Sequence, residues 1–217
     1  MSLSNYSQEL LILFTRFPQP GSAKTRLIPL LGEQGAARLQ RRMTEYMFAL
    51  AREIREKRDV EVQVHYSGGH DTEVRHWVPA EFRLRRQCKG DLGKRLQSAT
   101  NNAFAEGWGK IVVIGADCPY LTAEIMAEAF HQLQHADVVI GPALDGGYYL
   151  IGLRQQANCL WENVSWGTET VLRETSAHAI NSGLSLAYLT PLADIDRPED
   201  LTDLLQSAAA FPQVTDG

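Results

Sequence analysis

Three cationic side chains follow the first strongly apolar segment of the chain. Residues 10–14 are a continuous apolar run, and the Pro/Gly-containing loop after it carries Arg16, Lys24 and Arg26. A run of large apolar residues is typical of a strand buried on both faces, as in a parallel sheet covered by helices. Such sheets bind ligands at the carboxyl ends of their strands. Three cations at that place predict an anionic ligand, first of all a phosphate chain.

Aspartates follow the later apolar segments in the same way. Asp91 follows residues 82–87, Asp117 follows 111–114, Asp145 follows 138–140, and Asp194 and Asp196 follow 184–189. If these strands are parallel, the carboxylates gather with the cations at one edge of the sheet. Carboxylates beside phosphates suit Mg²⁺ or Mn²⁺, which are shared between carboxylate and phosphate oxygens. The sequence therefore predicts a metal-dependent nucleotide site at this edge.

Each of these motifs also has a purely structural interpretation. Residues 24–26 could be a solvated helix start, Asp117 and Asp196 could be helix caps, and residues 145–147 could be a hairpin turn. Trp166 could cover the cleft, stack on a ligand or only pack in the core. A P-loop is excluded, because residues 21–25 lack its first glycine and its Gly-Lys pair.

The segments that must position these residues alternate between strand and helix. Apolar periodicity predicts helices over 33–57, 92–105, 122–134, 168–181 and 198–206, and strands over 10–14, 60–66, 82–87, 111–114, 138–140, 148–153 and 184–189. The strand over 148–153 is a candidate hairpin partner of the one before it. This alternation predicts an α/β fold, a three-layer α/β/α sandwich with a mostly parallel central sheet.

Length and composition restrict the class of protein. The 217 residues suit one domain over 1–217, and we expect residues 1–8 to be disordered or left over from cloning. No apolar stretch approaches the roughly 20 residues that span a bilayer, so no membrane partner is expected. The three cysteines are widely spaced, which fits a reducing cytoplasm and offers no zinc motif.

The charges are unevenly divided along the chain. Residues 1–100 carry 17 Lys/Arg against 11 Asp/Glu, whereas residues 101–217 carry 4 against 15. A core built from both halves could form a cleft with cations on one wall and carboxylates on the other, although solvated helix faces would give the same totals. The net charge of −5 argues against a nucleic-acid partner.

Six motifs, taken in order, resemble those of one family. They are Phe-Thr-Arg-Phe-Pro-Gln-Pro-Gly-Ser-Ala-Lys-Thr-Arg-Leu (14–27), Gly-Asp-Leu-Gly-Lys-Arg-Leu (90–96), Gly-Ala-Asp-Cys-Pro-Tyr-Leu (115–121), Gly-Pro-Ala-Leu-Asp-Gly-Gly-Tyr-Tyr-Leu-Ile-Gly (141–152), Trp-Gly-Thr-Glu-Thr (166–170) and Asp-Ile-Asp-Arg-Pro-Glu-Asp-Leu (194–201). Over about residues 10–205 the chain resembles the DUF2064 family, also called radical-SAM/selenodomain-associated transferase 1. Its first loop is similar to that of phospholactate guanylyltransferases.

The resemblance implies a Rossmann-like, glycosyltransferase-A type fold and roles for named residues. The implied catalytic residues are Lys24, Arg26 and Asp145; the implied nucleotide-binding residues are Arg16, Gly21, Thr25, Asp91, Arg95, Gly146, Gly147, Tyr148, Trp166 and Thr168; and the implied metal ligands are Asp117 with Asp196 or Asp194. Residues 117–119 depart from the Asp-x-Asp of many glycosyltransferases, so a metal on Asp117 needs help from elsewhere.

Three functions follow from these features. The first is nucleotidyl transfer from an NTP to a small acidic or phosphorylated acceptor, favoured by Lys24 and Arg26 because a leaving pyrophosphate needs cations. The second is glycosyl transfer from a nucleoside-diphosphate sugar, with Asp145 as base or sugar contact. The third is a non-catalytic nucleotide-binding protein. In each case the partners are small molecules, while the base, the acceptor, the choice between Mg²⁺ and Mn²⁺ and the oligomeric state stay open.

Overall fold

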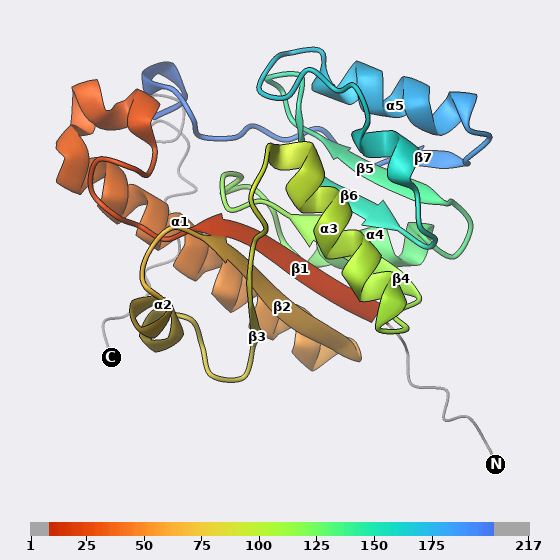
Figure 1. Cartoon of the computed structure of the whole chain (residues 1–217), viewed down its shortest axis with the longest axis horizontal. Coiled ribbons are helices and arrows are strands. Elements are labelled where there is room, and N and C mark those ends of the chain that lie inside the picture. Colours follow the sequence, from red (N-terminus) through yellow and green to blue (C-terminus); the bar gives the residue numbers. More distant parts are fainter. Residues whose placement is uncertain (1–8, 202–217) are drawn as a thin grey trace.

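One seven-stranded sheet organises the chain in a computed structural model, which describes residues 9–201 (Figure 1). Its strands are β1 (Glu9–Arg16), β2 (Val60–Ser67), β3 (Arg83–Arg86), β4 (Lys110–Ile114), β5 (Val138–Pro142), β6 (Tyr148–Leu153) and β7 (Leu186–Tyr188). The helices are α1 (Ile28–Lys57), α2 (Asp71–Trp77), α3 (Leu92–Ala105), α4 (Ala123–Gln132) and α5 (Val171–Asn181), with short 3₁₀ segments η1 (Thr25–Leu27) and η2 (Asn158–Trp161).

The strand pairing brings the ends of several strands to one edge. The strand order is β3-β2-β1-β4-β6-β5-β7. β1 pairs in parallel with β2 and β4, β2 with β3, and β5 with β7, whereas β6 runs antiparallel to both β4 and β5. The predicted mostly parallel sheet and the predicted hairpin partner are therefore confirmed. Because β5 and β6 are antiparallel neighbours, the turn between them lies at the same edge as the carboxyl ends of β1 and β4.

Helices cover both faces of the sheet, which confirms the three predicted layers. Leu11 and Leu13 of β1 pack with α1, α2 and α4 on one face. Leu10 and Ile12 pack with α3, η2 and α5 on the other face. All four leucine and isoleucine side chains are completely buried. Each such burial contributes about 1.5–3 kcal/mol relative to an exposed side chain, so β1 is a rigid support for the loop that follows it.

Several element boundaries differ from those predicted. α1 begins at Ile28, before a non-helical Gly32 (φ 67°), and its second part matches the predicted helix over 33–57. The helix predicted from residue 168 begins at Val171 instead, because Thr168 Oγ1 donates to the Ser165 carbonyl in a preceding turn. The short helix α2 was not predicted, since it buries only Val74 and so has no apolar periodicity.

Both predictions for the chain ends reach beyond the described part of the protein. Residues 198–201 are helical, and the remainder of the helix predicted over 198–206 lies outside the described residues, as do residues 1–8. Within residues 9–201, no helix combines the length and the apolar character that crossing a bilayer requires.

Candidate active site

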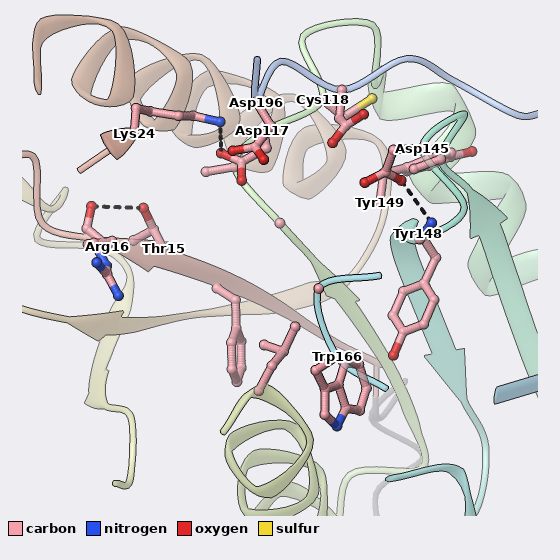
Figure 2. Close-up of a pocket in the computed structure, with 18 of the residues that line it drawn as sticks. Thr15, Arg16, Lys24, Asp117, Cys118, Asp145, Tyr148, Tyr149, Trp166 and Asp196 are labelled. Carbon is pink, nitrogen blue, oxygen red and sulfur yellow. Dashed lines mark hydrogen bonds and ion pairs between the residues drawn. The ribbon is translucent and has the colours of Figure 1, made fainter. Parts of the chain in front are cut away.

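A cavity of about 760 Å³ opens at the carboxyl ends of β1, β2 and β4 and beside the β5–β6 turn; we call it the cleft (Figure 2). Of the residues singled out in the sequence, it is lined by Arg16, Lys24, Thr25, Arg26, Arg95, Asp117, Asp145, Gly147, Tyr148, Trp166, Thr168, Asp194 and Asp196. Four cations and four carboxylates therefore share one concave surface, although they come from segments far apart in the chain.

Three other predicted residues lie outside the lining and support it instead. Gly21 (φ 77°) turns the first loop in a backbone region that favours glycine. Asp91 caps α3, since its Oδ1 accepts a hydrogen bond from the Lys94 amide at 2.8 Å. Gly146 (φ 90°) lies so close to the next loop that a Cβ would come within 2.2 Å of the Glu169 carbonyl oxygen. These three residues shape the backbone around the cleft.

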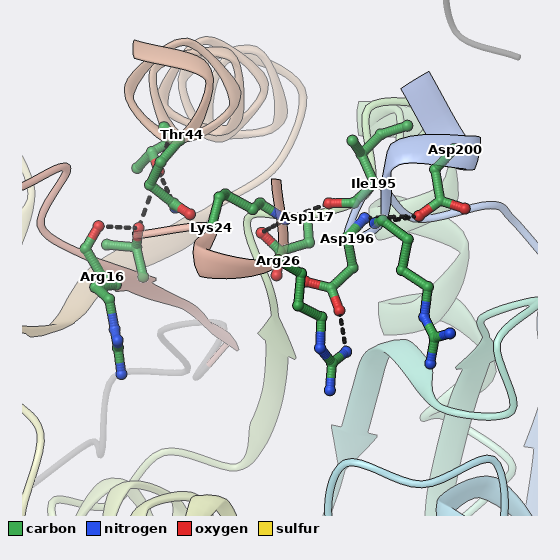
Figure 3. Close-up of polar contacts among 11 residues, drawn as sticks. Arg16, Lys24, Arg26, Thr44, Asp117, Ile195, Asp196 and Asp200 are labelled. Carbon is green, nitrogen blue, oxygen red and sulfur yellow. Dashed lines mark hydrogen bonds and ion pairs between the residues drawn. The ribbon is translucent and has the colours of Figure 1, made fainter. Parts of the chain in front are cut away.

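Lys24 and Asp117 form an ion pair at the base of the cleft. The Lys24 ammonium lies 2.8 Å from Asp117 Oδ1 and also donates to the Ile195 carbonyl (Figure 3). The Lys24 side chain is 3% exposed, whereas that of Asp117 is 51% exposed. Lys24 thus links the loop after β1, the end of β4 and the loop at 192–197. Its charge is directed at protein oxygens in this structure.

A second ion pair joins the same loops at the surface. Arg26 contacts the Asp196 carboxylate, with side chains 55% and 35% exposed. Asp200 accepts hydrogen bonds from the backbone amides of Asp196 and Arg197, which holds the loop in a fixed turn (Figure 3). Exposed pairs of this kind contribute about 0.2–1 kcal/mol, so the Arg26 side chain is freer to meet a ligand than Lys24.

The carboxylates of the cleft interact with one another. Burial raises the pKa of Asp194 to about 6, with further contributions from the negative charges of Asp145, Asp200 and Asp117. Asp145 Oδ1 also accepts a hydrogen bond from the Gly147 amide at 2.8 Å. The hairpin-turn interpretation of residues 145–147 and the cleft-lining interpretation therefore both hold.

This concentration of carboxylates fits a hard divalent cation only with help from a ligand. Within residues 9–201, no group of three or more His, Cys, Asp or Glu side chains is placed so that it could hold a metal ion. Mg²⁺ is usually bound through one or two carboxylates together with substrate phosphates. Asp117 and Asp194 have the oxygen donors for such a shared site, since both line the cleft and the repulsion between them would be relieved by a cation.

Aromatic side chains line the end of the cleft away from Lys24. Trp166 lies close to the first turn of α3, where a Cβ on Gly93 would come within 2.5 Å of the indole nitrogen. The Trp166 and Tyr148 rings meet edge to face, with centroids 6.5 Å apart (Figure 2). Phe14 completes this end and stacks on His65 at 5.5 Å. Trp166 therefore both packs in the fold and contributes to the cleft surface.

Sequence reasoning missed several residues of the lining. They include Ser22, Gln40, Ser67, Gln87, Leu92, Cys118, Tyr149, Gly167 and Val171. Two of them carried a usable signal in the sequence: Gln40 is a polar residue among the apolar positions of the helix predicted over 33–57, and Gln87 is the polar residue that ends a predicted strand. Burial raises the pKa of the Cys118 thiol to about 12, which disfavours its thiolate form.

Comparison with known proteins places the chain in a family. The family model "Uncharacterized protein conserved in bacteria (DUF2064)" matches residues 50–168. A crystal structure from Desulfovibrio desulfuricans G20, provisionally described as a nucleotide-diphospho-sugar transferase, is 30% identical with a TM-score of 0.87, over 95% of this chain and 91% of that one. A comparison with curated proteins finds no match.

More distant solved structures share the fold. The 4-diphosphocytidyl-2C-methyl-D-erythritol synthase of Anaerococcus prevotii DSM 20548 is 8% identical with a TM-score of 0.60, over 93% of this chain and 97% of that one. Rv0371c of Mycobacterium tuberculosis H37Rv, in complex with manganese, is 12% identical with a TM-score of 0.56, over 92% and 99%. The fold is thus that of transferases that use activated nucleotides. Within this class, the chain belongs to the DUF2064 family.

Proposed function

We propose that the protein is a metal-dependent nucleotidyltransferase that acts on an NTP and a small acidic or phosphorylated acceptor. The observation that carries this proposal is the single cleft in which four cations meet four carboxylates at the carboxyl ends of the strands. An NTP presents the matching groups, a polyanionic chain and oxygens that can share a cation with carboxylates.

The residues would act mainly by position and charge. An anionic oxygen of the acceptor attacks the α-phosphorus, the new P–O bond forms, and the bond to the bridging oxygen breaks with its electrons leaving on pyrophosphate. Arg26 would donate to the departing phosphates, whereas Lys24 would hold Asp117 in place beside them. An acceptor that brings its own anionic oxygen needs no general base, so Asp145 would orient the acceptor.

A divalent cation fits this scheme. Mg²⁺ or Mn²⁺ would neutralise charge on the phosphate oxygens. Asp117 and Asp194 would be its protein ligands, with Asp196 as the further candidate. A protein with the same fold is known in complex with manganese, which supports the proposal of a divalent cation but not the choice of its ligands.

Glycosyl transfer from a nucleoside-diphosphate sugar is the second candidate. It is favoured by the description of the D. desulfuricans relative and by Asp145, an exposed carboxylate in the cleft wall that could serve as base or sugar contact. A non-catalytic nucleotide-binding protein is the third candidate, and it would retain the cleft without turnover.

Small-molecule partners suit the size of the site. A volume of about 760 Å³ lies within the range of roughly 300–1,000 Å³ that is usual for small-molecule pockets. The cytoplasm is the proposed location, since Cys88, Cys118 and Cys159 are all free thiols.

The test is product formation with purified protein. Each of the four common NTPs is incubated with Mg²⁺ or Mn²⁺ and a panel of phosphorylated and carboxylic acids, and pyrophosphate is measured. Release that depends on both metal and acceptor supports nucleotidyl transfer. Asp117→Asn should abolish it, whereas the matched control Glu61→Gln, a carboxylate paired with Arg83 outside the cleft, should not.

The same preparation separates the alternatives. If UDP- or GDP-sugars stabilise the protein against heat more than NTPs do, and nucleoside diphosphate rather than pyrophosphate is released, glycosyl transfer replaces the first proposal. Tight nucleotide binding without turnover on any acceptor would leave the non-catalytic function.

A further inference from the structure

The charges of the cleft do not all remain available to a ligand. Two of the four cations are already paired with two of the four carboxylates, Lys24 with Asp117 and Arg26 with Asp196. Within residues 9–201, neither Arg16 nor Arg95 has a carboxylate oxygen within 4 Å of its guanidinium group, and the hydrogen-bond acceptors of both are neutral oxygens. The cleft therefore retains two guanidinium groups that make no direct ion pair, beside the two remaining carboxylates of Asp145 and Asp194.

Arg16 is held with its guanidinium at the cleft surface. It is the last residue of β1, and its Nη1 donates to the Ser22 carbonyl at 2.8 Å. Figure 3 shows the Lys24 side chain directed toward Asp117, whereas the Arg16 side chain points away from that pair. One hydrogen bond to a neutral carbonyl leaves most of its five N–H donors free for a ligand.

Arg95 is fixed in the same wall by neutral groups. It lies in the first turn of α3, where its Nε donates to the Asp91 carbonyl at 3.1 Å and its Nη1 to Gln87 Oε1 at 3.2 Å. The Gln87 amide in turn donates to the carbonyls of His65 and Thr15, at 2.8 and 3.3 Å. Gln87 thus ties Arg95 to the end of β1, next to Arg16, and restricts its rotamers before any ligand arrives.

We propose that Arg16 and Arg95 form an anion subsite of the cleft that binds a phosphate or carboxylate group of a substrate. A guanidinium group matches the geometry of such oxyanions, and preorganised donors gain affinity because little side-chain entropy is lost on binding. The subsite rests on the proposed function in that the substrates are taken to be anionic. The family resemblance implied roles for Arg16, Lys24, Arg26 and Arg95 alike, whereas the structure pairs Lys24 and Arg26 with carboxylates and leaves Arg16 and Arg95 for the anion.

The anion can come from the nucleotide or from the acceptor, and calorimetry separates the two sources. Binding of Mg²⁺–CTP, Mg²⁺–GTP and inorganic pyrophosphate represents the nucleotide, and binding of 3-phosphoglycerate represents a phosphorylated acid. Arg16→Met and Arg95→Met are each compared with Arg38→Met, which removes an exposed arginine that does not line the cleft. Near-ultraviolet circular dichroism establishes that each variant is folded.

We expect each cleft variant to weaken binding of at least one probe class about tenfold, as for the loss of one charge-assisted contact, and Arg38→Met to weaken it less than threefold. Weakening of the nucleotide probes assigns the subsite to the nucleotide, and weakening of 3-phosphoglycerate assigns it to the acceptor. Arg95→Lys should retain part of the affinity, since it keeps the charge but loses the planar fork.

The inference is overturned if the double variant Arg16→Met/Arg95→Met binds every probe within threefold of the wild type, or if Arg38→Met has an equal effect. Because calorimetry needs no turnover, this result is independent of the pyrophosphate assay. If no turnover is found but binding of the probes still depends on Arg16 and Arg95, the proposed reaction is refuted and the anion subsite is retained.

Discussion

Replacement of Lys24 by methionine tests whether the Lys24 ammonium group stabilises the fold or serves only to bind a ligand. Methionine keeps the length and the apolar part of the side chain and removes only the charge. In the structure, that charge is buried and contacts both the Asp117 carboxylate and the Ile195 carbonyl. Its removal leaves a buried carbonyl without its donor and Asp117 without its counterion.

The size of the effect follows from burial. Loss of a hydrogen bond from a charged group costs about 1.5–3 kcal/mol, and breaking a fully buried ion pair costs about 3–5 kcal/mol. Asp117 is 51% exposed, so water can solvate it and the lower range applies. We expect the free energy of unfolding to fall by about 2–3 kcal/mol. Arg26→Met is the matched control; its partner pair is exposed, so about 0.2–1 kcal/mol is expected.

Urea unfolding, monitored by circular dichroism at pH 7, measures both variants. Thermal unfolding should agree, with a decrease in Tm of roughly 4–12 °C for Lys24→Met and at most about 4 °C for Arg26→Met. A double-mutant cycle with Asp117→Asn should give a coupling energy of about 1–2 kcal/mol between Lys24 and Asp117. If Lys24→Met costs no more than Arg26→Met, Lys24 is not a structural ion and the reasoning fails.

Three further predictions concern pH and backbone geometry. Burial, aided by the charge of Arg85, lowers the pKa of His65 to about 4, so the unfolded chain binds the proton more tightly and the free energy of unfolding should fall from pH 6.5 toward pH 4. His65→Gln should reduce this dependence of the free energy of unfolding on pH, and an unaltered dependence would contradict the prediction. Burial and Asp145 raise the pKa of Asp194 to about 6, so the folded chain binds this proton more tightly than the unfolded chain, and the contribution of Asp194 to stability should decrease from about pH 4 to pH 6. In urea unfolding, Asp194→Asn should therefore become more stable relative to the wild type as the pH rises, and a difference that stays constant with pH would refute this. Gly146→Ala should lower the free energy of unfolding by about 2 kcal/mol or more, because the new Cβ would clash with the Glu169 carbonyl. Gly107→Ala, also at positive φ but with no atom within 4 Å of the new Cβ, should lower it by about 1 kcal/mol, and equal decreases in the two variants would argue against the clash.

Local pattern was sufficient for most of the fold. The apolar run over residues 10–14 predicted β1 because a strand buried on both faces needs apolar residues at successive positions, and both layers of helices pack on it. α3 was predicted at its actual bounds, since its apolar period and its Asp91 cap agree. α2 was missed because a helix of seven residues with one buried side chain is stabilised by its capping box and its surroundings, not by a periodic pattern.

The location of the candidate site was also predictable, because parallel strands bring the residues that follow them to one edge. Lys24 and Asp117, 93 positions apart, were expected at that edge and form an ion pair there. Gly21, Asp91 and Gly146 were expected among the ligand-binding residues and lie outside the cleft lining. Glycines and aspartates are common both in binding loops and in turns and helix caps, and the structure shows these three residues in turns and a helix cap.

By itself, the amino-acid sequence determined that this chain forms an α/β sheet with cations and carboxylates at the ends of its strands. Only the tertiary structure decided which charges are neutralised within the protein and which stay free. Lys24 and Arg26 are equivalent in the sequence, but one is buried against Asp117 and the other is exposed. Arg16 and Arg95 form no ion pair, because no described carboxylate oxygen lies within 4 Å of either guanidinium group. Charge pairing depends on distance through space and on access of water, and neither quantity is encoded in spacing along the chain.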